Sequence, residues 1–462
     1  MKIFMRNFGN GVVYIAIILH TLLFIFNIFF HPETFINADR ARERLVAATD
    51  LLSLPLQYEA ISEFLSNHGI LGDYVFQAII MGIVGQYGLI IFQIVLAILS
   101  YVCLYTIAKL IFQSERLAFV IALIYMMLPH SLVFPHQLIS EAIFDPLLVF
   151  SFYFLTKYLL DRVALHYLIT SAGFMGISAL IRPVSILFPF VLFAILLFHF
   201  RMSHLKKHTS YLVISILPIC IWMLFIFTNT GVLDLGKSEH DHGTNIYEKI
   251  SILSKRLPDK EQELVAQKYL QSEDQRVSVG KFLNFVMDYP ILYLDHTVKN
   301  LAVFLGKSDV NRLLIDVFGM DASDIRYNTK SWRRTVEQHG FPAFLEIGFS
   351  KYPLLIIINL LSSTFFVVFM LISIVGGGIV LWKNRPFKQK RDILLLSLYS
   401  FIFYILLASQ IVRFPLAKHR SPVEFAIVIF FIMGCQLIYD NLYWKRQPGC
   451  KAKKINARKA KI

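Results

Sequence analysis

The chain has 462 residues, of which 56% are apolar, 15% are aromatic and 16% are charged. A compact soluble core could not bury so much apolar surface, so the composition excludes a soluble globular protein. It also excludes a disordered protein, because disordered chains are poor in aromatic residues and rich in charge. We therefore predict an all-α polytopic membrane protein, whose net charge of +14 reflects basic loops on the cytoplasmic side.

Alternation of apolar stretches with basic clusters predicts ten membrane spans and cytoplasmic N and C termini. A span needs roughly 20 apolar residues, and Lys and Arg mark the cytoplasmic loops. The clusters that we place in the cytoplasm surround Lys2, Lys109, Lys157, Arg201, Lys383 to Arg391 and Lys445 to Lys461. The expected spans are 11–30, 89–111, two within 117–160, two within 167–200, 211–227, 354–382, 393–412 and 423–439.

Three of these stretches must contain a turn or a break. Residues 117–160 begin and end beside cytoplasmic clusters, so we expect an external turn from Pro129 to Glu141. Residues 167–200 are expected to form a hairpin broken at Arg182-Pro183, because proline disfavours helix continuation. The glycine-containing stretch 74–88 is expected to be interfacial or re-entrant.

This topology divides the chain into four parts. Residues 1–230 form a transmembrane module whose first external loop covers 34–73. Residues 231–352 form a second external region, which is mostly helical and contains amphipathic surface helices. Residues 353–440 contain the last spans, and 441–462 form a basic cytoplasmic tail.

Asp39 is the first candidate for chemistry, in the external sequence NADRARER. A carboxylate flanked by Arg40 and Arg42 at the membrane surface stays ionised and could act as a general base. Asp39 would equally suit the N-cap of a surface helix, so the structural interpretation stays open.

Glu141 and Arg182 lie at the predicted turns. Glu141 begins a span, and Asp145 follows one turn later on the same helix face. The helix dipole favours an acid at this position, whereas an acid that points into the bundle needs a partner or a function. Arg182 is expected near the outer interface, where it could either snorkel or hold a phosphate.

The segment VRFPLAKHRSP, residues 412–422, is basic although we predict that it is external. A short external loop that breaks the orientation rule needs a counter-ion, and an anionic lipid head group or a diphosphate would supply one. The alternative is a tolerated cluster of charges. The candidate binding residues of this segment are Arg413, Lys418, His419 and Arg420.

The histidines give weaker signals. His240-Asp241-His242 resembles a metal site only loosely, because residues i and i+2 do not share a helix face. We interpret that segment as a solvated loop. His130 and His136 flank the turn before Glu141 and could line the same cavity.

Together, these stretches resemble the C-type (GT-C) glycosyltransferase superfamily of polyprenyl-phosphate-sugar-dependent membrane enzymes. The similarity is to its dolichyl-phosphate-mannose-protein mannosyltransferase-like and aminoarabinose-transferase-like members. It rests on Asp39 and on the sequences LPHSLVFPHQLISEAIFDPLLVFSFYFL, AGFMGISALIRPVSILFPFVLFAILL and VRFPLAKHRSPVEFAIVIFF.

The resemblance implies an inverting hexosyl- or pentosyltransferase. It would move a sugar from a polyprenyl-phosphate donor to a lipid-linked glycan, lipid or protein acceptor at the outer membrane face, with no nucleic-acid partner. Asp39 corresponds to the acid that activates the acceptor hydroxyl. Some branches of the superfamily carry two adjacent acids at this position, whereas Arg40 follows Asp39 here. We therefore assign no metal ligand, and a requirement for a divalent cation stays open. The residues expected to bind substrate are Glu141, Arg182, Arg413, Lys418, His419 and Arg420.

Two other functions stay open from the sequence. An O-antigen-type oligosaccharide polymerase or ligase would suit the large 231–352 loop. A lipid-linked glycan transporter would need polar groups along a path through the membrane, whereas the charges here concentrate on one face. The chain contains no Asn-x-Ser/Thr acceptor, so we expect a bacterial inner membrane with the active site facing the periplasm or exterior.

Overall fold

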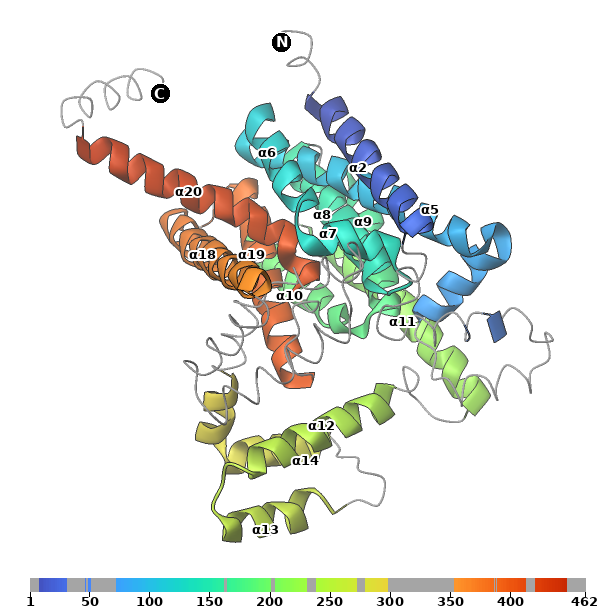
Figure 1. Cartoon of the computed structure of the whole chain (residues 1–462). Helices are drawn as coiled ribbons and strands as arrows, with labels where there is room; N and C mark the ends of the chain where they lie inside the picture. The colour runs from blue at the N-terminus through green and yellow to red at the C-terminus, as the bar shows by residue number, and fades with distance from the viewer. Residues whose placement is uncertain are drawn as a thin grey trace.

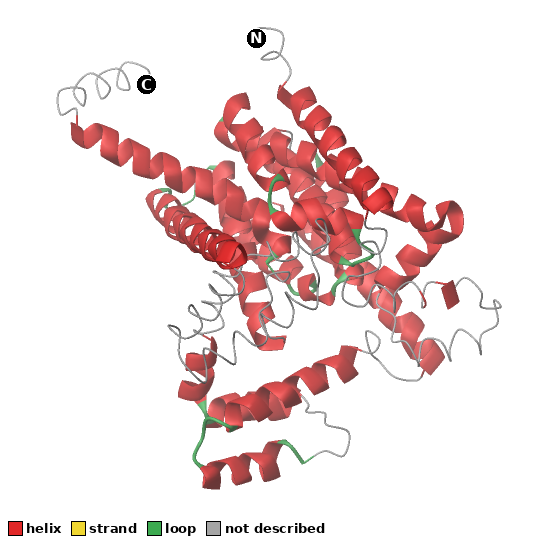
Figure 2. Cartoon of the chain, viewed as in Figure 1, coloured by secondary structure: helices red, strands yellow, loops and turns green. Residues whose placement is uncertain are grey.

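The described residues of the computed structural model form helices joined by short loops and turns, with no strand among them (Figure 2). The fold is therefore the all-α membrane fold that the composition predicts. The structure describes residues 8–30, 46, 49–50, 72–161, 164–200, 204–230, 238–271, 279–297, 353–385, 387, 389–412 and 420–446.

The described helices follow the predicted apolar segments closely. In the N-terminal half they are α2 (Phe8–Phe30), α5 (Gly72–Phe112), α6 (Glu115–Met126), α7 (Pro129–Val133), α8 (Glu141–Thr156), α9 (Leu165–Ile181), α10 (Phe188–Phe200) and α11 (Leu205–Thr230). A second group follows α11 and consists of α12 (Ser238–Ser254), α13 (Asp259–Tyr269) and α14 (Val279–Asp288). The last long helices are α18 (Pro353–Lys383), α19 (Lys390–Val412) and α20 (Glu424–Arg446), so α20 continues past the predicted end of the span at residue 439.

The structure confirms the positions of two predicted breaks in the helices. The chain bends by 70° between Glu115–Met126 and Pro129–His136, and α8 then begins at Glu141. Arg182 has an extended backbone and ends α9, because Pro183 begins a short 3-10 helix, Pro183–Ser185.

The break in α5 lies at Gly85, within the stretch that we expected to be interfacial or re-entrant. Gly85 has φ 74° and ψ 178°, a conformation that suits glycine because it has no Cβ. The backbone is helical on both sides of this break, so the stretch is a kinked extension of the helix that crosses the membrane.

Eight described helices are long and apolar enough to span a membrane, and the bent pair α6–α7 raises this number to nine. The shorter apolar helix Leu165–Ile181 would be the tenth. The number of spans therefore stays a prediction. In Figure 1 the start of α2 and the end of α20 lie at the top, and α12 to α14 lie at the bottom. The start of α2 and the end of α20 thus lie on one side of the helix bundle, and α12 to α14 lie on the other.

Helices α12 to α14 form a small unit with its own core. Apolar side chains from all three helices are buried together, including Ile250, Val265 and Phe285. Lys249 is buried among them, with its Nζ 5.9 Å from the ring centroid of Phe282.

Candidate functional site

The first element of the site is the ion pair between Glu141 and Arg182. Arg182 Nη1 lies 2.7 Å from Glu141 Oε1, and the two side chains are 14% and 6% exposed. Ser140 Oγ donates to Glu141 Oε2 at 3.1 Å. The guanidinium of Arg182 also lies 5.6 Å from the ring centroid of Phe144. The two turns predicted from the sequence thus meet, and each supplies one charge.

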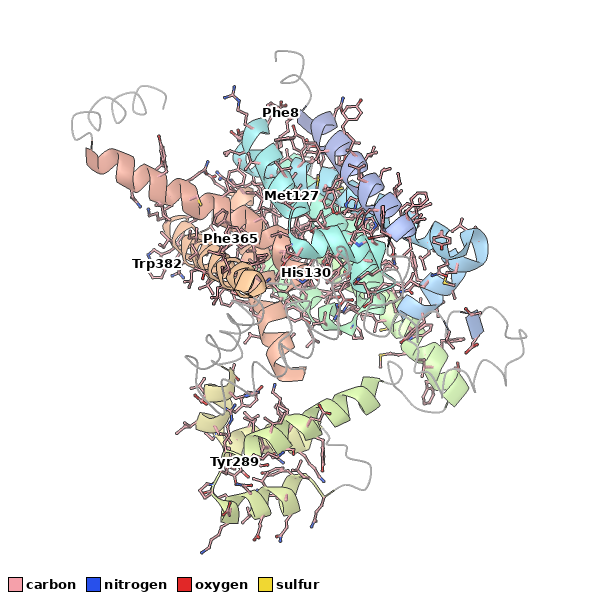
Figure 3. All side chains as sticks on the ribbon, viewed as in Figure 1. Phe8, Met127, His130, Tyr289, Phe365 and Trp382 are labelled. Atoms are coloured by element: carbon pink, nitrogen blue, oxygen red, sulfur yellow. The ribbon has the colours of Figure 1, made fainter. Side chains whose placement is uncertain are left out.

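The second element joins the start of α20 to α7. Glu424 Oε1 lies 3.1 Å from Arg420 Nε and 3.0 Å from His130 Nδ1, so one carboxylate oxygen accepts from both side chains. Arg420 is completely buried, and its guanidinium lies 4.5 Å from the ring centroid of Phe366. His130 lies within the helix bundle (Figure 3). This buried network fixes the start of α20 against the N-terminal half of the chain.

Asp145 links the two elements. Its carboxylate hydrogen-bonds the side chain of Ser421 and interacts electrostatically with Glu141, Arg182 and His130. A cavity of about 20 Å³ lies beside these groups, which is room for about one water molecule. Its polar lining consists of Ser100, Tyr101, Tyr125, His130, Ser131, Glu141 and Asp145.

A third polar network borders this cavity and ties α2 to the site. The hydroxyl of Tyr101 donates its one hydrogen to Ser131 O at 2.9 Å, so it accepts from His20 Nε2 at 3.0 Å. His20 Nδ1 then accepts from His136 Nε2 at 3.0 Å. The direction of these hydrogen bonds follows because a neutral imidazole has one N–H donor and one acceptor nitrogen. Sequence reasoning missed His20, because a single histidine inside an apolar span gives no signal of its partners.

The ion pairs determine what each arginine can do. Both guanidiniums have a glutamate partner, so their charge is fixed in position and partly compensated. Arg182 keeps some exposure and could still contact an anionic ligand. Arg420 is fully buried, so we expect it to act through Glu424 and His130. The sequence alone does not reveal that Arg182 is partly exposed whereas Arg420 is buried.

Several predicted site residues lie outside the described residues, namely Asp39, Arg413, Lys418 and His419. His240, Asp241 and His242 lie in α12, so their backbone is helical and the predicted loop is wrong. Among the residues that the structure describes, no group of three or more His, Cys, Asp or Glu side chains could hold a metal ion.

Part of the chain matches a known protein family. Residues 67–226 match the family model described as dolichyl-phosphate-mannose-protein mannosyltransferase. This stretch includes Glu141 and Arg182, so the resemblance to GT-C glycosyltransferases is confirmed there. No curated protein shows significant sequence similarity to the chain.

Among solved structures, the chain is similar to ArnT from Cupriavidus metallidurans, crystallised with undecaprenyl phosphate. The sequence identity is 11% and the TM-score is 0.39, over 92% of this chain and 77% of that chain. At this TM-score the similarity adds nothing to the assignment.

Proposed function

We propose that this integral membrane protein is an inverting glycosyltransferase that uses a polyprenyl-phosphate sugar. The acceptor would be a lipid-linked glycan, a lipid or a protein at the outer face of a bacterial inner membrane. The observation that carries the proposal is the ion pair of Glu141 and Arg182, which lies within the region that matches a glycosyltransferase family model. The family match supports sugar transfer, and the partly exposed side chain of Arg182 supports a phosphate-bearing donor.

In the proposed reaction, the acceptor hydroxyl attacks the anomeric carbon while the bond from that carbon to the phosphate oxygen breaks. Such a displacement passes through an oxocarbenium-like transition state. A base takes the proton of the acceptor hydroxyl, and we assign this role to Asp39. The leaving phosphate gains negative charge, which Arg182 would stabilise. Arg413, Lys418 and His419 are assigned to the same phosphate, and Arg420 is assigned to positioning Glu424.

Glu141 has a defined part in this arrangement. Because its Oε1 lies 2.7 Å from Arg182 Nη1, it orients the guanidinium at the end of α9. An arginine held in this way loses less side-chain entropy when a phosphate binds than a free arginine would. Glu141 therefore contributes to donor binding through Arg182.

Complementation of a deletion strain tests the proposal. Wild type or Asp39→Asn is restored at matched membrane levels, and lipid-linked and surface glycans are compared by mass spectrometry. We expect the deletion to lose one sugar, wild type to restore it and Asp39→Asn to fail. Full restoration by Asp39→Asn would remove the assigned base. Loss of glycan chain length without loss of a sugar type would favour the polymerase.

A further inference from the structure

Asp145 carries one carboxylate oxygen that the fold does not use. The side chain is 8% exposed, lies on α8 one turn after Glu141 and lines the small cavity. Its interaction with Ser421 accounts for one hydrogen bond. Within the described part of the chain, Asp145 Oδ1 has no hydrogen-bond partner.

A buried carboxylate oxygen without a donor is unfavourable, because desolvation is not offset by a hydrogen bond. Neighbouring polar groups in the cavity wall already interact with protein atoms. Tyr101 donates to Ser131 O, His130 contacts Glu424, and Glu141 pairs with Arg182. Asp145 therefore brings to the wall of this cavity a carboxylate whose Oδ1 the fold leaves without a hydrogen bond.

The chemistry of the cavity selects among ligands. Its volume of about 20 Å³ suits one water-sized group. A phosphate oxygen would be repelled by the carboxylates of Asp145 and Glu141. A metal ion would need several oxygen or nitrogen ligands, and the described residues offer no such group. A hydroxyl is small and neutral, and it can donate.

We propose that Asp145 Oδ1 accepts a hydrogen bond from a hydroxyl of the sugar substrate, which inserts into this cavity. The proposal rests on the proposed glycosyl transfer and adds a specificity-determining residue to it. The hydroxyl belongs either to the sugar of the lipid-phosphate donor or to the acceptor glycan. Both sources present the same chemistry to Asp145.

The test compares wild type with three variants in the deletion strain at matched membrane levels, with sugar transfer measured by mass spectrometry. Asp145→Asn keeps the side-chain volume but replaces one carboxyl oxygen, which accepts, by an amide nitrogen, which only donates. Ser421→Ala removes the internal partner of Asp145 and leaves Oδ1 in place. Asp161→Asn is the matched control, because Asp161 lies in the π-helical segment Lys157–Asp161 that follows α8 and pairs with Lys157 at the surface.

We expect Asp145→Asn to lower the transfer rate about 10- to 100-fold, since the loss of one partner leaves the other buried polar group without its hydrogen bond. Ser421→Ala should lower the transfer rate clearly less than Asp145→Asn does, and Asp161→Asn should transfer sugar at the wild-type rate. Wild-type transfer by Asp145→Asn would overturn the proposal. An equal loss in Ser421→Ala would also overturn it, because Asp145 would then act only by holding Ser421. In membranes, a raised KM for either the donor or the acceptor identifies which substrate carries the hydroxyl.

A binding measurement separates this proposal from the proposed function. Purified wild type and Asp145→Asn are placed in nanodiscs and titrated with methyl mannoside, methyl glucoside, methyl galactoside and methyl arabinoside. Ligand binding to the folded state raises Tm, so at least one glycoside should raise the Tm of wild type more than that of Asp145→Asn. If wild type restores no sugar in cells, the proposed function fails while this Tm difference still supports the hydroxyl site. Equal Tm responses in both proteins would overturn the site.

Discussion

Removal of Glu424 should destabilise the protein strongly, because it removes a carboxylate that pairs with a fully buried arginine. Arg420 and Glu424 are 0% and 1% exposed, and Glu424 Oε1 accepts from both Arg420 and His130. Breaking a buried ion pair by removing one partner costs about 3–5 kcal/mol. We expect Glu424→Ala to lower the free energy of unfolding by about this amount.

Replacement of both charged partners should cost much less than removal of one. Apolar residues of similar volume are tolerated at buried ion pairs, so Arg420→Met combined with Glu424→Leu should recover most of the loss. Glu115→Ala is the control, because Glu115 and Lys109 form an exposed pair, with side chains 45% and 47% exposed. Such surface pairs contribute below about 1 kcal/mol.

Equilibrium unfolding in mixed micelles, with increasing SDS, measures these differences. The reasoning would be refuted if Glu424→Ala lost no more stability than Glu115→Ala. It would also be refuted if the double variant were as unstable as Glu424→Ala, because the cost would then come from packing alone.

Four further predictions concern separate parts of the molecule. At Gly434 a Cβ would lie 2.7 Å from a backbone carbonyl oxygen of α18, so Gly434→Ala should cost about 1–3 kcal/mol in the same unfolding assay. Gly173→Ala, which meets no atom within 4 Å, should be neutral or stabilising. Burial lowers the pKa of Lys249 from 10.5 to about 8, so the unfolded chain binds more protons between these values and stability should rise with pH across this window. Thermal unfolding of Lys249→Met should lack that rise, and an unchanged rise would contradict the assignment. Arg182→Ala should raise the KM for the lipid-phosphate donor about tenfold or more while changing the KM for the acceptor little, and equal effects on both would indicate a structural arginine. A reporter tag inserted in the 231–352 region should be accessible from outside, whereas a cytoplasmic tag would invert the topology.

The sequence predicted the helices well because apolar length and proline act locally. The break at Arg182-Pro183 and the turn before Glu141 both follow from neighbouring residues and from the side of the basic clusters. The pairing of Glu141 with Arg182 could not be predicted in this way, since it depends on how α8 packs beside α9.

The difference between the two arginines shows the same limit. The sequence around Arg420 reads as a basic external segment, yet the side chain is completely buried because Glu424 and His130 lie beside it. His130 is 294 residues away from Glu424 in the sequence, so no local pattern connects them. The network of His20, His136 and Tyr101 likewise joins separate segments, and its members look ordinary one at a time.

The most direct test of the central claim is turnover by the purified protein. Wild type in nanodiscs is given undecaprenyl-phosphate-linked hexoses or pentoses, with membranes from the deletion strain as the acceptor source, and free undecaprenyl phosphate is measured by mass spectrometry. The account predicts acceptor-dependent release with at least one donor, loss of release in Asp39→Asn and a raised donor KM in Arg182→Ala. Release that is equally fast in Asp39→Asn, or no release by wild type from any of these donors, would contradict it.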